Sequence, residues 1–509
     1  MLDLRTLSRA TLEQRPEATA LIIGTRSISY REFDAAIQSH ADRLALLGMG
    51  RGDRIGLMSH NSPDLAALLM ATWRIGAIAV PLNHRYQGPE VEYAASTGGL
   101  RMLIVQDALA DRLAGRFDPP EGLEHVRTLG RAVPAIGSAW AVGEGDDPPP
   151  VKPAPPVDEE VAAIYFTSGS TSKPKGVVHT ARSIIETGRS RRQTMDLRED
   201  DVWLLSTQLV HVSASLGSLI PALTVGGTVV LLEEFSPERW LEAFRAHRPT
   251  RSVILPSLLH DVLDCPAHEK VDFGSIRSME CGGDFVTPDL YAAWGRVCEE
   301  PLSQLIGMTE CEGYCLRHPG TPLREGAAGT PRVGVEVRVV DERDRPLPPD
   351  RIGELCIRSA SMTTGYWNDE AHTREAIRDG WLHSGDQGRI DEDGNVWFVG
   401  RSKEIIVKRG SNIAPGEVES VLDQHPDIAE SAVVGTPPGP HGQRVVAFVE
   451  AEPGRELDVP GTRDWAAERI AAFKVPDEWV LIDQLPRNPV GKLDRAELHR
   501  RCTERFPAE

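Results

Sequence analysis

Helical and extended patterns alternate through the first four hundred residues, and this alternation limits the fold more than any other feature of the sequence. Apolar residues recur at helical spacing over residues 28–48, and residues 54–62 predict a strand that runs into a loop. Residues 63–76 predict a helix that opens on a proline, and residues 77–83 predict a short buried strand. The pattern predicts an α/β fold in which helices cover sheets.

The sequence after residue 404 predicts a smaller α+β unit. A helix is expected over residues 417–425, and strands over residues 430–435 and 444–450. We therefore place a domain boundary at residues 401–404. The predicted domains are residues 1–400 and residues 405–509.

The composition makes several classes of partner improbable. With 75 acidic and 56 basic side chains, the net charge of -19 repels the phosphates of nucleic acids and anionic membrane surfaces. No apolar run approaches the ~20 residues that span a bilayer, and the N-terminal residues lack the apolar core of a signal peptide. We expect a cytoplasmic protein with no nucleic-acid or membrane partner.

The seven cysteines show no spacing that is typical of zinc ligands, and their odd number favours free thiols in a reducing compartment. They are Cys265, Cys281, Cys298, Cys311, Cys315, Cys356 and Cys502.

A polar loop follows the apolar strand in "YFTSGSTSKPKGVVHT", residues 165–180. Gly169 and Gly176 permit backbone angles that let successive amide groups converge on one anion. Hydroxyl and lysine side chains add donors and charge, so the loop suits a polyphosphate. Its spacing is not that of a Walker A loop, and a flexible surface turn fits the composition equally well. The polar side chains are Ser168, Ser170, Thr171, Ser172, Lys173 and Lys175.

Three more segments accompany this loop: "IGMTECEG" at residues 306–313, the stretch from His383 to Glu419, and "PRNPVGKLDR" at residues 486–495. In this order the four segments resemble the signature motifs of the adenylate-forming (ANL) superfamily, which includes acyl-CoA synthetases, stand-alone adenylation enzymes and firefly luciferase. The resemblance covers nearly the whole chain. It implies a large α/β N-terminal domain and a smaller, mobile C-terminal lid domain joined by a hinge.

The resemblance also implies an activity. A small carboxylic acid reacts with ATP to give an acyl-adenylate and pyrophosphate, and the acyl group then passes to the thiol of CoA or of a phosphopantetheine carrier protein. Since the carboxylate and the phosphates repel each other, fixed donors and positive charge must offset the repulsion. The implied cofactors are ATP, Mg²⁺ and CoA.

Each motif then receives an implied role. The loop from Ser168 to Lys175 would hold the β- and γ-phosphates, Thr309 would donate to the α-phosphate, and Glu310 would bind Mg²⁺. Taken alone, "MTE" also fits a helix N-cap with an acid in the first turn. The implied catalytic residues are Thr167, Thr309, Glu310 and Lys492. The implied cofactor-binding residues are Ser168, Gly169, Ser170, Thr171, Lys173, Lys175, Gly282, Gly283, Ile306, Asp386, Arg401 and Gly410.

The C-terminal residues matter most for the mechanism. Lys492 lies on a Pro/Gly turn and would bridge the substrate carboxylate and the α-phosphate, although most terminal lysines are simply solvated. Asp386 and Arg401 would bind the ribose, and Lys403 would be the hinge pivot. Rotation of the lid would then bring the Gly410 segment to the site, where glycine allows a pantetheine arm to approach.

The predicted acid pocket departs from the family pattern. Ile306 occupies a position where many relatives have an aromatic residue that stacks on adenine, and Asp284 and Phe285 follow the adenine-segment glycines. The segment around His211 carries no Asp that could pair an α-amino group, which argues against an ordinary α-amino acid. Its serines favour a small or polar acid rather than a long alkyl chain. His211 fits packing and substrate contact about equally. The implied pocket residues are His211, Val212, Ser213, Ser215, Gly307 and Met308.

Three hypotheses follow. The first is a carboxylate–CoA ligase, monomeric or homodimeric. Arg85 resembles a basic position that some relatives use for the phosphates of CoA. The second is a stand-alone adenylation enzyme that loads a carrier protein or adenylates an unusual small oxyanion. The third is a nucleotide-binding regulator without turnover, which the presence of Lys492, Thr309 and Glu310 disfavours.

Overall fold

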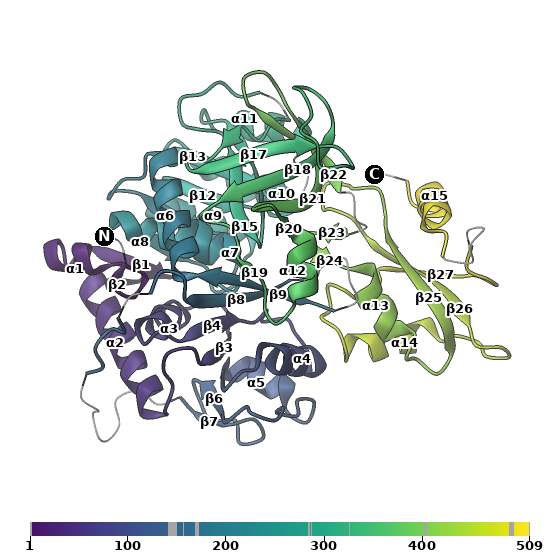
Figure 1. The fold of residues 1–509 in the computed structure, drawn as a ribbon, viewed down its shortest axis with the longest axis horizontal. Coiled ribbons are helices and arrows are strands. Elements are labelled where there is room, and N and C mark those ends of the chain that lie inside the picture. Colours follow the sequence, from purple (N-terminus) through teal and green to yellow (C-terminus); the bar gives the residue numbers. More distant parts are fainter. Residues whose placement is uncertain are drawn as a thin grey trace.

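The computed structural model describes residues 3–140, 150–155, 157–167, 173–283, 286, 288–324, 326–401, 405–487 and 493–507. Figure 1 shows a large N-terminal body of sheets covered by helices, with a smaller group of strands and helices to its right that holds the C-terminal end. This arrangement confirms the predicted fold class, a large α/β domain with a small α+β domain.

One large sheet runs in the order β16-β15-β14-β13-β12-β10-β11-β1-β2. Its central neighbours are parallel and buried, and its margins are closed by antiparallel pairs. Its strands are β1 (Thr19–Ile23), β2 (Arg26–Ser29), β10 (Val202–Leu205), β11 (Thr228–Leu231), β12 (Arg251–Ile254), β13 (Ser278–Gly282), β14 (Leu302–Met308), β15 (Cys311–Leu316) and β16 (Thr330–Pro331).

A second large sheet runs in the order β19-β9-β8-β4-β3-β5-β6-β7. The strands expected within residues 54–62 and 77–83 are β3 and β4, which pair in parallel at its centre. Its strands are β3 (Arg54–Met58), β4 (Ile78–Pro81), β5 (Met102–Gln106), β6 (His125–Leu129), β7 (Ser138–Ala139), β8 (Val161–Thr167), β9 (Lys175–Thr180) and β19 (Gly365–Tyr366).

Helices fill the space between and around these sheets. Helix α3 begins after the Ser62 N-cap with Pro63 at its first turn, and nearly all of its residues are buried in a core that joins strands of both sheets. The helices of this part are η1 (Leu4–Thr6), α1 (Arg9–Gln14), α2 (Tyr30–Leu46), α3 (Pro63–Arg74), α4 (Gly88–Gly98), α5 (Asp107–Leu113), α6 (Ala181–Met195), α7 (Val212–Ala214), η2 (Ser215–Leu219), α8 (Ile220–Val225), α9 (Pro237–His247), α10 (Pro256–Asp264), η3 (Pro266–Lys270) and α11 (Pro288–Gly295).

A third, antiparallel sheet follows along the chain and leads to the predicted boundary. Helix α12 (Glu370–Ala376) precedes its last strands. The strands are β17 (Val335–Val340), β18 (Gly353–Ser359), β20 (Ile377–Arg378), β21 (Trp381–Ile390) and β22 (Val396–Arg401).

The C-terminal part has a core of its own. The predicted apolar helix face is present in α13, where Val418 and Leu422 are fully buried, and the helix runs from Pro415 to Leu422 rather than to residue 425. The elements are β23 (Ile406–Lys408), β24 (Ser411–Ile413), α13 (Pro415–Leu422), β25 (Ile428–Gly435), β26 (Val445–Ala451), α14 (Val459–Ala467), β27 (Glu478–Leu481) and α15 (Arg495–Arg505).

A buried ionic network lies in the N-terminal core. The Arg191 guanidinium is inaccessible to solvent and contacts Glu280 and Glu312, each at 2.8 Å. Arg332 donates to the backbone carbonyl of Glu312 at 2.6 Å. The oppositely charged groups therefore compensate one another in a region from which water is excluded.

All seven cysteines are free thiols, as expected, and all except Cys265 are buried. Among the described residues, no helix combines the length and the apolar character that crossing a bilayer requires.

Candidate active site

Two hairpins from the two large sheets bring predicted catalytic residues to one cavity. In the hairpin of β8 and β9, Thr167 lies directly opposite Lys175. In the hairpin of β14 and β15, Thr309 and Glu310 form the turn. All four residues, with Met308, line a cavity of about 1230 Å³. Hydroxyl, ammonium and carboxylate groups therefore meet at a site large enough for a nucleotide.

The turn at Thr309 and Glu310 corrects one interpretation. Read alone, "MTE" also fits a helix N-cap, but the chain enters this turn from β14 and leaves it as the antiparallel strand β15. The N-cap alternative is therefore wrong.

His179 anchors this turn from the neighbouring sheet. Its Nε2 lies 2.8 Å from the carbonyl oxygen of Thr309, so this nitrogen carries the hydrogen and donates it. Burial lowers the pKa of His179 to about 4, although the bond to Thr309 opposes this shift. The imidazole is therefore neutral at pH 7 and serves as a fixed donor.

Tyr366 and Thr363 hold Glu310. The Tyr366 hydroxyl donates to Oε1 of Glu310 at 2.7 Å, and the backbone N–H of Thr363 donates to its carbonyl oxygen at 2.6 Å. Burial, reinforced by the Glu310 carboxylate, raises the pKa of Tyr366 above its usual value, so the phenol keeps its proton. The carboxylate is thus fixed at the cavity wall.

The C-terminal part reaches the same cavity. Ile405 and Asn412 line it together with the two hairpin turns. Gly410 has φ +73°, and a Cβ atom there would lie 2.5 Å from the side chain of Leu255 in the N-terminal domain. Gly410 itself does not line the cavity. A glycine is needed because the two domains meet at this point.

Asp386 lies beside the cavity in β21. Gly385 and Gln387 on either side of it line the cavity, whereas Asp386 is buried, with its backbone opposite that of Arg401 in β22. Ser384 Oγ accepts a hydrogen bond from the backbone N–H of Asp386 at 3.0 Å.

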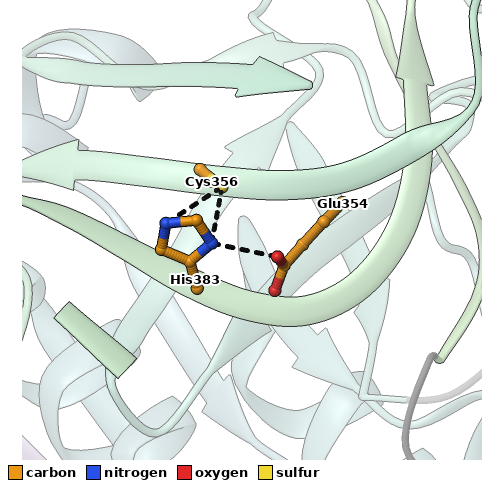
Figure 2. Close-up of side chains that lie close together, drawn as sticks. All are labelled: Glu354, Cys356 and His383. Atoms are coloured by element: carbon orange, nitrogen blue, oxygen red, sulfur yellow. Dashed lines mark hydrogen bonds and ion pairs between the residues drawn. The ribbon is translucent and has the colours of Figure 1, made fainter. Parts of the chain in front are cut away.

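A side-chain network supports this strand, and Figure 2 shows Glu354, Cys356 and His383 converging from β18 and β21. His383 Nδ1 lies 2.9 Å from Glu354 Oε2 and 3.3 Å from Cys356 Sγ. These ligand types could hold a metal, but Arg378 Nη2 lies 2.6 Å from the same Nδ1. Because a guanidinium already supplies positive charge there, we interpret the group as a hydrogen-bond network. Glu354 Oε1 also accepts from the N–H of Gly385, which ties the network to the Asp386 segment.

The predicted acid-pocket segment forms α7 and the π-helical turn η2. Ser215 is buried, and its hydroxyl donates to the carbonyl of His211 and lies 2.8 Å from the hydroxyl of Tyr165. Since both contacts are internal, Ser215 supports the segment. His211 is exposed, and Val212 and Ser213 are half-buried. None of these four residues lines the cavity described above.

The adenine-segment residues lie at the ends of β13 and β14. A Cβ atom at Gly282 would lie 2.4 Å from the carbonyl oxygen of Leu305, and Gly283 has φ +86°. Ile306 is 6% exposed and packs in a core with Tyr314. Gly282, Gly283, Ile306 and Gly307 do not line the cavity.

Lysine side chains of the polar loop face aromatic rings. Lys173 Nζ lies 5.5 Å from the ring centre of Tyr93, and Lys175 Nζ lies 5.2 Å from that of Tyr366. Lys173 does not line the cavity. The predicted residues that lie outside the described part of the chain are Ser168, Gly169, Ser170, Thr171, Ser172, Asp284, Phe285, Lys403 and Lys492.

His179 and Tyr366 were not among the sequence-predicted site residues. The sequence gives only a weak indication of a role for His179. It is a polar residue in the mostly apolar run "GVVHT", which directly follows the polar loop. Tyr366 has no such signal, because its role depends on the pairing of β19 with β9.

Comparisons with known proteins match most of the chain. The AMP-binding enzyme family matches residues 8–367, and its C-terminal domain matches residues 417–492. An indoleacetate–CoA ligase from Aromatoleum aromaticum is 32% identical, with 95% of each chain covered. The fatty acid–[acyl-carrier-protein] ligase ScoC of Streptomyces coeruleorubidus is 31% identical, covering 98% of this chain and 97% of that protein.

A solved structure extends the likeness over the whole chain. The amide bond synthetase McbA from Marinactinospora thermotolerans superposes with a TM-score of 0.87 at 28% identity, covering 99% of this chain and 100% of that one.

Proposed function

The chain belongs to the AMP-binding enzyme family and is an AMP-forming acid–thiol ligase, and we propose that it joins a small carboxylic acid to the thiol of CoA through an acyl-adenylate. One observation carries the proposal. Thr167, Lys175, Thr309 and Glu310 of the N-terminal domain line one cavity with Asn412 of the C-terminal part.

In the first half-reaction, a carboxylate oxygen of the acid attacks the α-phosphorus of ATP, and the bond to pyrophosphate breaks. Both reactants are anions, so the site must supply donors and positive charge. We assign Thr309 to the α-phosphate, and Lys173, Lys175 and the hydroxyl loop to the β- and γ-phosphates. Lys492 would neutralise the carboxylate and the α-phosphate together.

The residues around Glu310 fit a Mg²⁺ ion. Its carboxylate lies at the cavity wall, and the hydrogen bond from Tyr366 limits its rotation, which suits a hard cation that prefers oxygen ligands. The ion would neutralise charge on the phosphates. Thr167, opposite Lys175, would add a hydroxyl contact.

The nucleoside would occupy the side of the cavity near β21. We assign Asp386 and Arg401 to the ribose, because their backbones lie opposite each other and Gly385 and Gln387 beside Asp386 line the cavity. Gly282, Gly283 and Ile306 would border the adenine. A glycine lets a planar base approach the backbone closely, and Ile306 would offer an aliphatic contact in place of stacking.

In the second half-reaction, the thiol sulfur attacks the acyl carbonyl carbon, the thiol proton is lost, and AMP leaves. We propose that the C-terminal domain turns about Lys403 and that the arrangement of this structure serves transfer, because Ile405 and Asn412 already line the cavity. Arg85 donates to Ser411 at 3.1 Å and would place a cation near the phosphates of CoA.

The relatives differ in what they are named for: some are CoA ligases, one is an acyl-carrier-protein ligase, and one is an amide bond synthetase. CoA is our first choice because most of the similar ligases are named for it. A carrier protein is the second candidate, because ScoC covers nearly the whole chain. Without an Asp beside His211, a small polar or aromatic acid fits the pocket better than an α-amino acid.

Acid-dependent exchange of labelled pyrophosphate into ATP tests the first half-reaction. The panel should include indoleacetate, ferulate, 3-hydroxybenzoate and a medium-chain fatty acid. AMP release with the best acid is then compared with CoA, a holo-carrier protein or an amine as acceptor. We expect exchange without CoA and the fastest AMP release with CoA. No exchange with any acid would contradict the proposal, and faster release with the carrier protein would assign that acceptor instead.

A further inference from the structure

The ammonium group of Lys474 is buried between carboxylates from two domains. Its Nζ lies 2.7 Å from Glu90 Oε1 and 2.6 Å from Glu417 Oε1. The three side chains are 3%, 9% and 8% exposed, respectively. Glu90 belongs to α4 of the N-terminal domain, whereas Glu417 and Lys474 belong to the C-terminal part, which lies to the right of α4 in Figure 1.

Neighbouring residues extend this interface. The Arg85 guanidinium lies 4.3 Å from the ring centre of Phe473, and Lys474 Nζ lies 5.2 Å from that of the buried Tyr86. Arg85 also bonds Ser411, next to Asn412 in the cavity wall. The buried ion pairs therefore lie on the same domain contact that places the β23–β24 hairpin at the site.

The two carboxylates favour the charged form of Lys474, whereas burial raises the pKa of Glu90 despite the attraction of Lys474. Burial alone would lower the pKa of Lys474, but the carboxylates of Glu90 and Glu417 raise it above its usual value. The two pairs are not equivalent, because Lys474 and Glu417 share a domain and can stay together if that domain rotates. Only the contact with Glu90 depends on the arrangement of the domains.

We propose that Glu90 and Lys474 are positioning residues that hold the C-terminal domain in the thiol-transfer arrangement. This rests on the proposed two-step function. The pair acts through Ser411, Asn412 and the rest of the β23–β24 hairpin, and it has no role in the attack of the acid on ATP. Its loss is therefore expected to slow transfer selectively.

Glu90→Gln is a suitable test. Glutamine keeps the size of the side chain and can still accept from the backbone N–H of Gln87, as Glu90 Oε2 does at 2.9 Å in the capping box of α4. Because the amide oxygen keeps the bond from Gln87, the amide NH₂ faces Lys474 Nζ and cannot accept its hydrogen. Loss of this charge-assisted bond is expected to slow acyl transfer about tenfold. Pyrophosphate exchange should stay within about twofold of wild type.

Glu468→Gln is the matched control, because Glu468 pairs with Arg116 across the same two domains at 3.5 Å, but the side chains are about half exposed. This variant should transfer at the wild-type rate. A double variant, Glu90→Gln with Lys474→Met, should transfer the acyl group no more slowly than the Lys474→Met variant alone, because the two changes remove the same contact between Glu90 and Lys474. Equal losses in both half-reactions, or additive losses, would overturn the proposal.

A distance measurement tests the pair without turnover. Spin labels at Asp111→Cys in α5 and Glu504→Cys in α15, both exposed, report the separation of the domains in a Cys265→Ser background. We expect Glu90→Gln to broaden the distance distribution of the wild type and Glu468→Gln to leave it unchanged. An unchanged distribution with unchanged transfer in Glu90→Gln would overturn the proposal. A wild type without exchange would instead overturn the proposed function, and the labels would still report on the pair.

Discussion

The carbonyl oxygen of Thr309 accepts a hydrogen bond from Nε2 of His179 at 2.8 Å, and this bond joins hairpins that belong to different sheets. Thr309 is assigned to the α-phosphate, and its backbone is thus held by the side chain of His179, which lies 130 positions earlier in the chain. The position of Thr309 depends on that donor.

Substitution of His179 should therefore impair adenylation. His179→Ala leaves the carbonyl of Thr309 without its donor, which costs about 1–3 kcal/mol, and we expect pyrophosphate exchange to fall about tenfold or more. His179→Gln can present an amide N–H from a similar position and should recover part of the rate. If His179→Ala exchanges at the wild-type rate, the bond has no functional role.

The same residue gives a pH-dependent stability. The pKa of His179 is about 4 in the folded chain, against 6.5 ordinarily. Between these two pH values, His179 binds a proton in the unfolded chain but not in the folded chain. Protonation therefore favours the unfolded chain, so the free energy of unfolding is highest above pH 6.5 and decreases as the pH falls toward 4. The loss amounts to about 3 kcal/mol. Urea unfolding from pH 7.5 to 4.5 should show a shallower decline in His179→Gln than in wild type, and parallel declines would contradict the assignment.

Glu310→Gln should weaken the use of Mg²⁺. The amide keeps the shape of the side chain but removes the charge, so we expect the exchange rate at fixed Mg²⁺ to fall about a hundredfold. Tyr366→Phe removes only the donor to Glu310 and should cost about tenfold. Exchange measured against Mg²⁺ concentration separates binding from rate, and an unchanged Mg²⁺ dependence in Glu310→Gln would exclude Glu310 as the ligand.

Lys492→Ala should separate the two half-reactions. We expect pyrophosphate exchange to fall about a hundredfold or more, because the ammonium no longer offsets the repulsion between carboxylate and phosphate. Transfer from chemically prepared acyl-adenylate to CoA should continue. Full exchange activity in this variant would show that another cation acts in adenylation.

Gly410→Ala should slow transfer because its Cβ atom would clash with Leu255 across the domain contact. We expect acyl transfer to fall about tenfold, and the double variant with Leu255→Ala to recover part of it. Gly454→Ala is the control, since Gly454 also has a positive φ, +78°, but no atom lies within 4 Å of the added Cβ. If both alanine variants slow transfer equally, backbone strain rather than the clash is responsible.

Periodicity and motif order predicted much of the fold. Strands β3, β4, β25 and β26 and helices α3 and α13 occur where apolar spacing predicted them. The ends were less accurate, as in α13, because the last turn of a helix depends on tertiary contacts. The turn at Thr309 and Glu310 showed the same limit, since a short polar stretch after an apolar run fits either a helix start or a hairpin.

The contacts that organise the site were not predictable. His179 and Thr309, or Glu90 and Lys474, meet only because of the order of strands in the sheets and the orientation of the domains. Periodicity reports which face of an element is buried but not which element covers it. The sequence pattern therefore identified several of the chemical groups at the site, whereas the residues that contact them could be identified only from the structure.

The Arg191 network constrains how the acid specificity of this protein can change. A Cβ atom at Gly217 in η2 would lie 2.4 Å from Glu312, so the predicted pocket segment rests directly on these buried charges. Neutralising one of these side chains alone would leave a buried charge unpaired and would lower the free energy of unfolding by about 3–5 kcal/mol. Natural drift or directed evolution should thus alter Arg191, Glu280 and Glu312 as a set, because variants changed at only one of these positions would be strongly destabilised.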